Sequence, residues 1–149
     1  MYKHILMPTD GSALSKRAVA EAIKFAQSSG ARITALHVTL PYPLQGAHAA
    51  EVAAIEALQP GNYSVRSEEF AKSVLDEVGA AAAAAGLTFA AVHVSSRSVW
   101  QAIIETAKDR KCDLIFMASH GWRGLEGLLL GSETHKVLTH SNIPVLVYR

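Results

Sequence analysis

Cysteine is almost absent from this chain of 149 residues, since Cys112 is its only copy. A single cysteine excludes an internal disulfide and favours a reducing compartment. Long apolar runs are absent as well, and the amino terminus lacks the length and cleavage pattern of a signal peptide. No run reaches the roughly 20 apolar residues that a membrane-spanning helix needs. We therefore expect a soluble, cytoplasmic protein that does not enter a membrane.

An excess of one charge is also missing. Fourteen Lys and Arg residues face 13 Asp and Glu residues, which leaves a formal net charge of +1. A protein that binds nucleic acid by neutralising phosphates needs a basic face, so we expect no nucleic-acid partner. Half of the residues are apolar and 18% are charged, which is enough to build one hydrophobic core. We expect residues 1–149 to form a single domain.

Short apolar runs alternate with segments of helical periodicity. Strands are expected at 5–7, 31–39, 87–94, 113–118 and 144–148, and helices at 13–29, 70–85, 99–107 and 133–139. Ser12 is a good helix N-cap, and Gly30 a good helix end. The alternation predicts a parallel sheet covered on both faces, and right-handed crossovers favour an open, doubly wound sheet of five strands.

The segment 40–62 interrupts this rhythm. It contains three prolines and two glycines around an alanine-rich piece at 47–58. We interpret it as a surface excursion that carries a short helix, because it is too short to form a core of its own.

Three loops should meet at the carboxyl ends of the strands, where open α/β sheets bind ligands. They are residues 8–12, residues 38–39 and the glycine-rich loop 118–132. Glycines allow the backbone to approach a ligand closely, and successive N–H groups can form a nest for phosphate oxygens. The loop ends at Gly131-Ser132, directly before a predicted helix whose N-terminus favours anions. It has no GxxxxGK[ST] sequence and is therefore not a P-loop.

Other interpretations of these residues stay open. The loop can be an ordinary glycine-rich connection with Ser132 as a helix cap. Asp10 can bind ribose hydroxyls, or it can stabilise its own turn through an Asx bond. His120 can touch a phosphate or shape the loop through a buried hydrogen bond. Trp122 and Arg123 are expected to be exposed at the loop tip, where they gate the ligand or contact a partner.

The remaining histidines and the cysteine are weaker candidates. His37 and His93 lie on predicted strands and are expected to pack there. His135 and His140 are five residues apart, so they do not share a helix face and make a poor pair of metal ligands. Cys112 has no CxxC partner and is expected to be structural.

The run Met117-Ala-Ser-His-Gly121, followed after nine intervening residues by Gly131-Ser132, resembles the universal stress protein family. The opening Ile5-Leu-Met-Pro-Thr-Asp-Gly-Ser12 and the closing Pro144-Val-Leu-Val147 resemble it too, so the resemblance covers essentially the whole chain. ATP-binding members carry G-x2-G-x9-G-[ST]. Ala118 stands at the first glycine of this pattern, and we expect the pocket to survive the added methyl group because φ at a strand end is negative.

The resemblance implies an adenine nucleotide alpha hydrolase-like fold with strand order 3-2-1-4-5. It implies ATP as the ligand, with Mg or Mn on its phosphates. By position, Asp10 would hold the ribose, the backbone at Val38 would read the adenine edge, and Gly121, Gly131 and Ser132 would hold the phosphates. The other implied site residues are Pro8, Thr9, Met117, Ala118, His120, Glu133 and Thr134. Glu133 would oppose phosphate unless its side chain turns away.

The resemblance also implies a homodimer, and the apolar strand Val145–Tyr148 at a sheet edge offers a surface for it. Three functions remain possible on this fold: an ATP-binding regulatory module of the stress response, a slow nucleotide hydrolase, or a dimeric scaffold without nucleotide. Catalysis would need a placed base and a charge clamp. The loop offers His120 and Arg123 but no lysine clamp, so we expect no efficient catalysis. The downstream partner cannot be read from the sequence.

Overall fold

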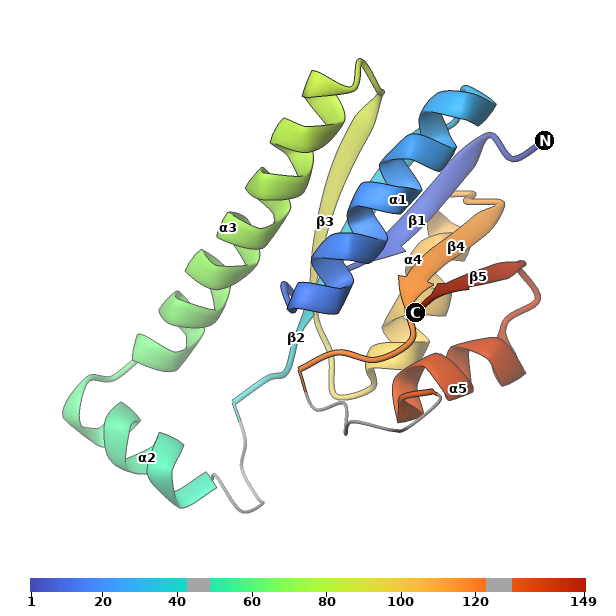
Figure 1. Cartoon of the computed structure of the whole chain (residues 1–149). Coiled ribbons are helices and arrows are strands. Elements are labelled where there is room, and N and C mark those ends of the chain that lie inside the picture. Colours follow the sequence, from blue (N-terminus) through green and yellow to red (C-terminus); the bar gives the residue numbers. More distant parts are fainter. Residues whose placement is uncertain (43–48, 123–129) are drawn as a thin grey trace.

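The structure, a computed structural model, describes residues 1–42, 49–122 and 130–149 (Figure 1). Its elements in chain order are β1 (His4–Pro8), α1 (Ala13–Ser29), β2 (Arg32–Thr39), α2 (Ala49–Leu58), α3 (Asn62–Ala84), β3 (Phe89–Ser95), α4 (Val99–Asp109), β4 (Leu114–Ala118), α5 (Ser132–His140) and β5 (Val145–Tyr148). The strands form one parallel sheet in the order β3-β2-β1-β4-β5. The doubly wound fold and the strand order 3-2-1-4-5 are thus confirmed.

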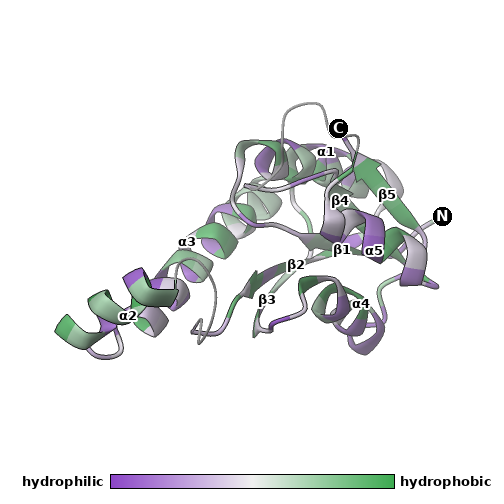
Figure 2. Ribbon diagram, turned by 90° about the horizontal axis from the view of Figure 1, so that it is seen from below, coloured by the Kyte–Doolittle hydropathy of each residue, from purple (hydrophilic) through white to green (hydrophobic). Residues whose placement is uncertain are grey.

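Helices cover both faces of the sheet, and β1 lies at its centre. In Figure 2 the helices α1 and α4 lie on opposite sides of the strands. Ile5 and Met7 of β1 pack in the cluster that faces α1 and α3, whereas Leu6 packs in the cluster that faces α4 and α5. This alternation follows from the two-residue period of a strand that is buried on both faces.

The limits of α1 match the sequence signals. The Ser12 hydroxyl accepts a hydrogen bond from the Ser15 N–H at 3.3 Å, and Gly30 ends the helix with φ +67°.

The strand β3 begins at Phe89, two residues after the expected start at residue 87. The amides of Gly86 and Leu87 instead donate to carbonyl groups of α3, at Ala83 and Ala82, and so still belong to the end of that helix.

The α2 helix and the first turns of α3 project away from the sheet (Figures 1 and 2). The expected short helix is confirmed at Ala49–Leu58, while residues 43–48 lie outside the described residues. α3 begins at Asn62, earlier than the apolar period that starts at Phe70 predicts. Its first turn is fixed by the Glu56 carboxylate, which accepts from the N–H groups of Gly61 and Tyr63.

This projecting part, α2 with the start of α3, is anchored at its base but has no buried side chain in α2. The Tyr63 hydroxyl donates to the Leu40 carbonyl oxygen at 3.1 Å, and the rings of Tyr42 and Tyr63 pack edge to face. Leu58 is 84% exposed.

None of the helices among the described residues is both long and apolar enough to cross a membrane.

Candidate functional site

The turn after β1 is closed by its own polar side chains. Asp10 Oδ1 accepts from the Ser12 N–H at 2.9 Å, which forms the Asx bond that the sequence left open as one role for this residue. The Ser15 hydroxyl donates to Thr9 Oγ1 at 2.7 Å, and Thr9 is buried. The turn therefore presents the Asp10 carboxylate at the carboxyl end of β1 in a defined orientation.

The second carboxylate oxygen of Asp10 contacts the glycine-rich loop. Asp10 Oδ2 accepts from the main-chain N–H of Trp122 at 3.0 Å. A Cβ atom at Gly121 would lie only 1.9 Å from Asp10 Oδ2, so no side chain fits there without displacing Asp10. Gly121 thus allows a close approach of backbone to the Asp10 carboxylate.

β2 extends beyond the end of β1, and its residue Val38 lies past the last pair of residues between the two strands. Leu36 O accepts from the Thr9 N–H, whereas Thr39 O accepts from the Ser96 N–H after β3. Even-numbered residues of β2 therefore turn their backbone groups toward β1, and odd-numbered ones toward β3. Because β1 pairs only as far as Pro8 with Leu36, the N–H and C=O of Val38 face the space beside Asp10.

The last two residues of β4, Met117 and Ala118, pack in the hydrophobic core. Ala118 is 8% exposed, and its methyl group joins the core cluster on the α1 face, so the alanine at the first glycine of the motif is accommodated. Lys111 is the one non-glycine residue with positive φ in the described part of the chain, so Ala118 has the negative φ expected at a strand end. The Thr134 hydroxyl donates to the Ala118 carbonyl oxygen at 3.0 Å. Met117 packs on the opposite face, toward α4 and α5.

The two ends of the glycine-rich loop lie against each other. The Gly131 N–H donates to the Ser119 carbonyl oxygen at 2.7 Å, and a Cβ atom at Gly131 would lie 3.3 Å from both Cα and Cβ of His120. His120 Nδ1 lies 3.1 Å from the hydroxyl of its neighbour Ser119, a partly buried contact between adjacent residues. Arg123, Gly124 and Gly127 lie outside the described residues.

The α5 helix begins one residue earlier than expected. Its N-cap is Gly131, so the alternative interpretation of Ser132 as the cap is wrong. None of the described side chains makes a capping hydrogen bond to this helix start. Helix N-termini carry N–H groups without intrahelical partners and a positive dipole end, so this start can accept an anion.

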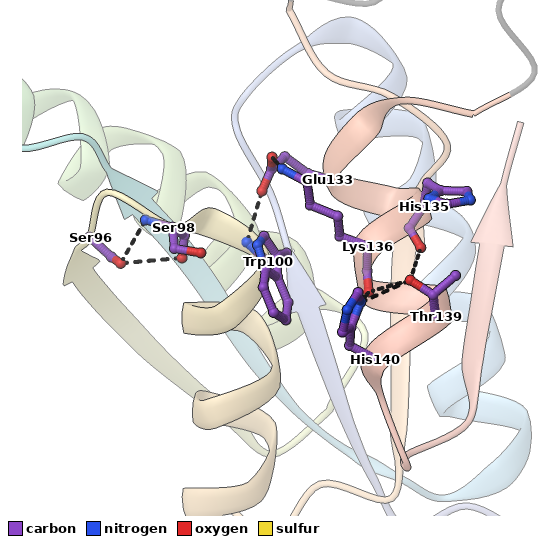
Figure 3. A network of polar contacts seen from close by, with 8 residues as sticks. All are labelled: Ser96, Ser98, Trp100, Glu133, His135, Lys136, Thr139 and His140. Atoms are coloured by element: carbon purple, nitrogen blue, oxygen red, sulfur yellow. Dashed lines mark hydrogen bonds and ion pairs between the residues drawn. The ribbon is translucent and has the colours of Figure 1, made fainter.

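Glu133 turns its carboxylate away from this helix start (Figure 3). Its Oε2 accepts from the main-chain N–H of Trp100 at 2.9 Å, and its Oε1 lies 3.4 Å from Lys136 Nζ. Ser98, the N-cap of α4, makes no side-chain capping bond, so Glu133 fulfils that role from α5. The negative charge that the sequence places beside Ser132 is thereby directed to the positive end of α4.

Of the weaker candidates, His37 and Cys112 are buried, whereas His93 of β3 is exposed, so the expectation that it packs on its strand is wrong. His37 Nδ1 lies 2.8 Å from the Thr9 carbonyl oxygen, and burial lowers the pKa of His37. Burial raises the pKa of Cys112 to about 11, which fits an unreactive packed thiol. The His140 ring packs on Trp100, with 4.6 Å between the ring centroids. The described residues contain no group of three His, Cys, Asp or Glu side chains placed to hold a metal ion.

Two hollows among the described residues lie outside this site. One, of about 390 Å³, is bounded by α1 and by Leu146 and Tyr148 of β5. The other, of about 220 Å³, lies between α1 and α3 and borders the site only through Thr9 and Gly11. The candidate site is therefore defined by its loop backbones and helix start, not by either hollow.

Two contacts of the site have little signal in the sequence. The indole of Trp122 donates from Nε1 to the Asp10 carbonyl oxygen at 2.7 Å, and the Glu133 cap on α4 joins residues 33 positions apart. Both depend on how distant loops meet. The bond from the Ser15 N–H to the Ser12 hydroxyl, by contrast, has a local signal, because the two residues are three apart at a helix start.

A family model described as the universal stress protein family matches residues 1–149. The chain belongs to the universal stress protein family. A universal stress protein of Thermus aquaticus is 34% identical over 149 residues, covering 100% of both chains.

Two solved structures extend this universal stress protein comparison to the fold. The structure of MJ0577, a protein of Methanocaldococcus jannaschii, has a TM-score of 0.78 at 28% identity, covering 99% of this chain and 95% of that chain. A universal stress protein in complex with cAMP has a TM-score of 0.69 at 29% identity, covering 99% and 97%. The fold is therefore the adenine nucleotide alpha hydrolase-like fold of universal stress proteins.

Proposed function

We propose that this universal stress protein is an ATP-binding regulatory module of the stress response that acts as a homodimer without efficient catalysis. The observation that carries the proposal is the meeting of three features at one edge of the sheet. They are the Asp10 carboxylate, the backbone edge at Val38 and the start of α5 without a side-chain cap. The similar structure in complex with cAMP supports an adenine nucleotide as the ligand class.

Each feature suits a different part of the nucleotide. Asp10 accepts hydrogen bonds from ribose hydroxyls, as acidic residues do in nucleotide-binding folds. The N–H and C=O groups of Val38 match the donor and acceptor on the adenine edge. Ser132 and the N–H groups that follow it, on Glu133 and Thr134, bind the terminal phosphates. Pro8, Thr9, Met117 and Ala118 support the sugar and the base, and His120, Gly121 and Gly131 shape the loop around the phosphates.

The divalent cation, Mg or Mn, enters bound to the nucleotide phosphates, as Mg²⁺ commonly does. Ser132 is exposed at the start of α5, where its hydroxyl can complete the coordination or bind a phosphate oxygen. Glu133 does not supply a ligand, because its carboxylate is used on Trp100 and Lys136. Phosphoryl transfer also needs a charge clamp and a water-orienting group, so hydrolysis in this proposal is slow.

Calorimetric titration of nucleotide-free protein with ATP, ADP, AMP and cAMP in the presence of Mg²⁺ tests the proposed ligand. The terminal phosphates contact α5, so we expect affinity to fall from ATP to ADP to AMP. Asp10→Asn keeps the Oδ1 acceptor for Ser12 but removes the charge and replaces Oδ2, which accepts from Trp122, by an NH2 group, so it should weaken ATP binding roughly tenfold or more.

Asp76→Asn, on the exposed face of α3, is the matched control and should bind ATP like the wild type. Equal binding by the wild type and Asp10→Asn would contradict the site. An absence of any nucleotide binding would leave the scaffold function, and rapid phosphate release would favour a hydrolase.

In the same proposal residues 1–149 act as one cytoplasmic domain that dimerises through β5. Pro144 O accepts from Ile115 and Tyr148 O from Ser119, so the even-numbered residues of β5 bond to β4. The N–H groups of Val145 and Val147 consequently point to the open edge. Pairing of this edge with a second copy gives a two-fold interface.

Val147→Pro removes an outward N–H group and leaves the bonds to β4 in place. We expect it to shift the protein from dimer to monomer in sedimentation velocity, while the circular dichroism spectrum is retained. Leu146→Pro is the contrasting variant, because its N–H faces β4 and its loss should destabilise the fold. A Val147→Pro protein that remains fully dimeric would exclude strand pairing at β5.

A further inference from the structure

Trp122 joins the glycine-rich loop to the turn after β1 through two hydrogen bonds to one residue. Its main-chain N–H donates to Asp10 Oδ2 at 3.0 Å, and its indole Nε1–H donates to the Asp10 carbonyl oxygen at 2.7 Å. Trp122 as a whole residue is 66% exposed. Because so much of the ring stays in water, burial explains little of its position, and the two bonds to Asp10 define the contact.

The Asp10 carboxylate is consequently held from two sides. The Ser12 N–H binds Oδ1 at 2.9 Å, and the Trp122 N–H binds Oδ2. A carboxylate has about four acceptor positions, so each oxygen keeps capacity for one more donor. Two ribose hydroxyls can then bind a carboxylate whose plane is already fixed, without the entropy cost of ordering it in the complex.

Gly121 makes this arrangement possible from the loop side. A Cβ atom at that position would come within 1.9 Å of Asp10 Oδ2, so only glycine lets the Trp122 N–H reach the carboxylate. Asp10, Gly121 and Trp122 therefore form one unit in which the loop orients the acidic side chain.

We propose that Trp122 is a positioning residue that orients Asp10 to discriminate ribose from 2′-deoxyribose. The inference rests on the proposed function, in which Asp10 accepts hydrogen bonds from the ribose. A site built to bind a hydroxyl group rejects the analogue that lacks it, because its polar partner is left unpaired. That rejection depends on how firmly the partner is held, and Trp122 supplies this constraint through the indole bond to the Asp10 backbone.

The test compares dissociation constants for ATP and 2′-dATP, with Mg²⁺, in the wild type, Trp122→Phe and Trp100→Phe. Trp122→Phe keeps the aromatic ring and the main-chain N–H but loses the indole donor. Trp100→Phe is the same substitution at the other tryptophan of the chain, on α4, where its backbone contacts Glu133. Melting temperatures of all three proteins check that the fold is retained.

The wild type should bind ATP about tenfold or more tightly than 2′-dATP. In Trp122→Phe this ratio should fall by about threefold to tenfold, mainly through weaker ATP binding, and Trp100→Phe should keep the wild-type ratio. An unchanged ratio in Trp122→Phe overturns the inference and leaves the proposed function standing. Tighter binding of both sugars by Trp122→Phe also overturns it, because the indole would then block the site.

Two outcomes in the wild type separate the inference from the function on which it rests. Equal affinity for ATP and 2′-dATP contradicts the role of Trp122 while nucleotide binding itself is upheld. Binding of neither nucleotide contradicts both the inference and the proposed function.

Discussion

The helices α1 and α5 begin at the same edge of the sheet, but their first turns have different partners. At α1 the buried Ser12 hydroxyl accepts from Ser15, and Asp10 accepts from Ser12. At α5 the N-cap is Gly131, and none of the described side chains caps the helix. A helix start that is already capped has fewer N–H groups to offer a ligand. The difference indicates that α5 is the one of the two that is suited to a phosphate.

Gly131→Val should have the largest effect on ATP binding at the start of α5. Its Cβ atom would lie 3.3 Å from the Cα and Cβ atoms of His120 and from the Ser119 carbonyl oxygen, so these neighbours must give by a few tenths of an ångström, and the two methyl groups of valine add further bulk. We expect loss of measurable ATP binding and a decrease in unfolding free energy of about 1–3 kcal/mol, as is usual for an overpacked site. Titration calorimetry and urea unfolding measure the two effects.

Gly131→Ala is the graded control, because it adds the Cβ atom without the two methyl groups. Its ATP affinity should lie between those of the wild type and Gly131→Val. If Gly131→Val bound ATP like the wild type, the start of α5 could not be the phosphate site.

A pair of serine variants sharpens the comparison. Ser12→Ala removes the cap of α1 and should lower the unfolding free energy by about 1 kcal/mol, with ATP affinity nearly unchanged. Ser132→Ala removes an exposed hydroxyl at the start of α5 and should lower ATP affinity about threefold to tenfold, with stability nearly unchanged. Thermal unfolding measures the stability of both variants, and calorimetry measures their ATP affinity. The opposite pattern would assign the ligand to α1.

The smallest expected effect concerns pH and the turn after β1. Burial lowers the pKa of His37, which contacts the Thr9 carbonyl oxygen. The unfolded chain then binds a proton more readily than the folded one, so this contribution to stability is complete above about pH 6.5 and is lost as the pH falls below it. His37→Gln should reduce the fall in melting temperature between about pH 8 and about pH 5.

His135→Gln, the same substitution at an exposed position of α5, is the control for general effects of replacing an imidazole by an amide. Part of the dependence should remain in His37→Gln, because burial also lowers the pKa of His4. An identical pH dependence in His37→Gln and the wild type would show that His37 is not buried as a neutral ring.

The parts of the fold that were predictable from the sequence have local signals. The apolar run at Ile5–Met7, the cap at Ser12 and the left-handed Gly30 fix β1 and α1, because each acts through neighbouring residues. The early start of α3 was not predictable, because Glu56 caps it from another helix and its first turns carry no apolar period. The start of α5 was misplaced by one residue, because Gly131 serves as its N-cap without a side chain.

The candidate site likewise has a part that was predictable from the sequence and a part that was not. Its location was predictable, because parallel strands bring their carboxyl ends to one edge. The contacts that orient its side chains were not, because Asp10 meets Trp122 across 112 positions and Glu133 meets Trp100 across 33. Such contacts depend on how loops and helices pack after the sheet has formed, and no spacing rule encodes them.

The most direct measurement is an amide NMR titration of the full chain with ATP and Mg²⁺. The account predicts that the largest shifts fall on the amides of Gly131, Ser132, Glu133 and Val38, while those of the first turn of α1, after Ser12, change little. Large shifts in the first turn of α1 with none at the start of α5 would contradict it.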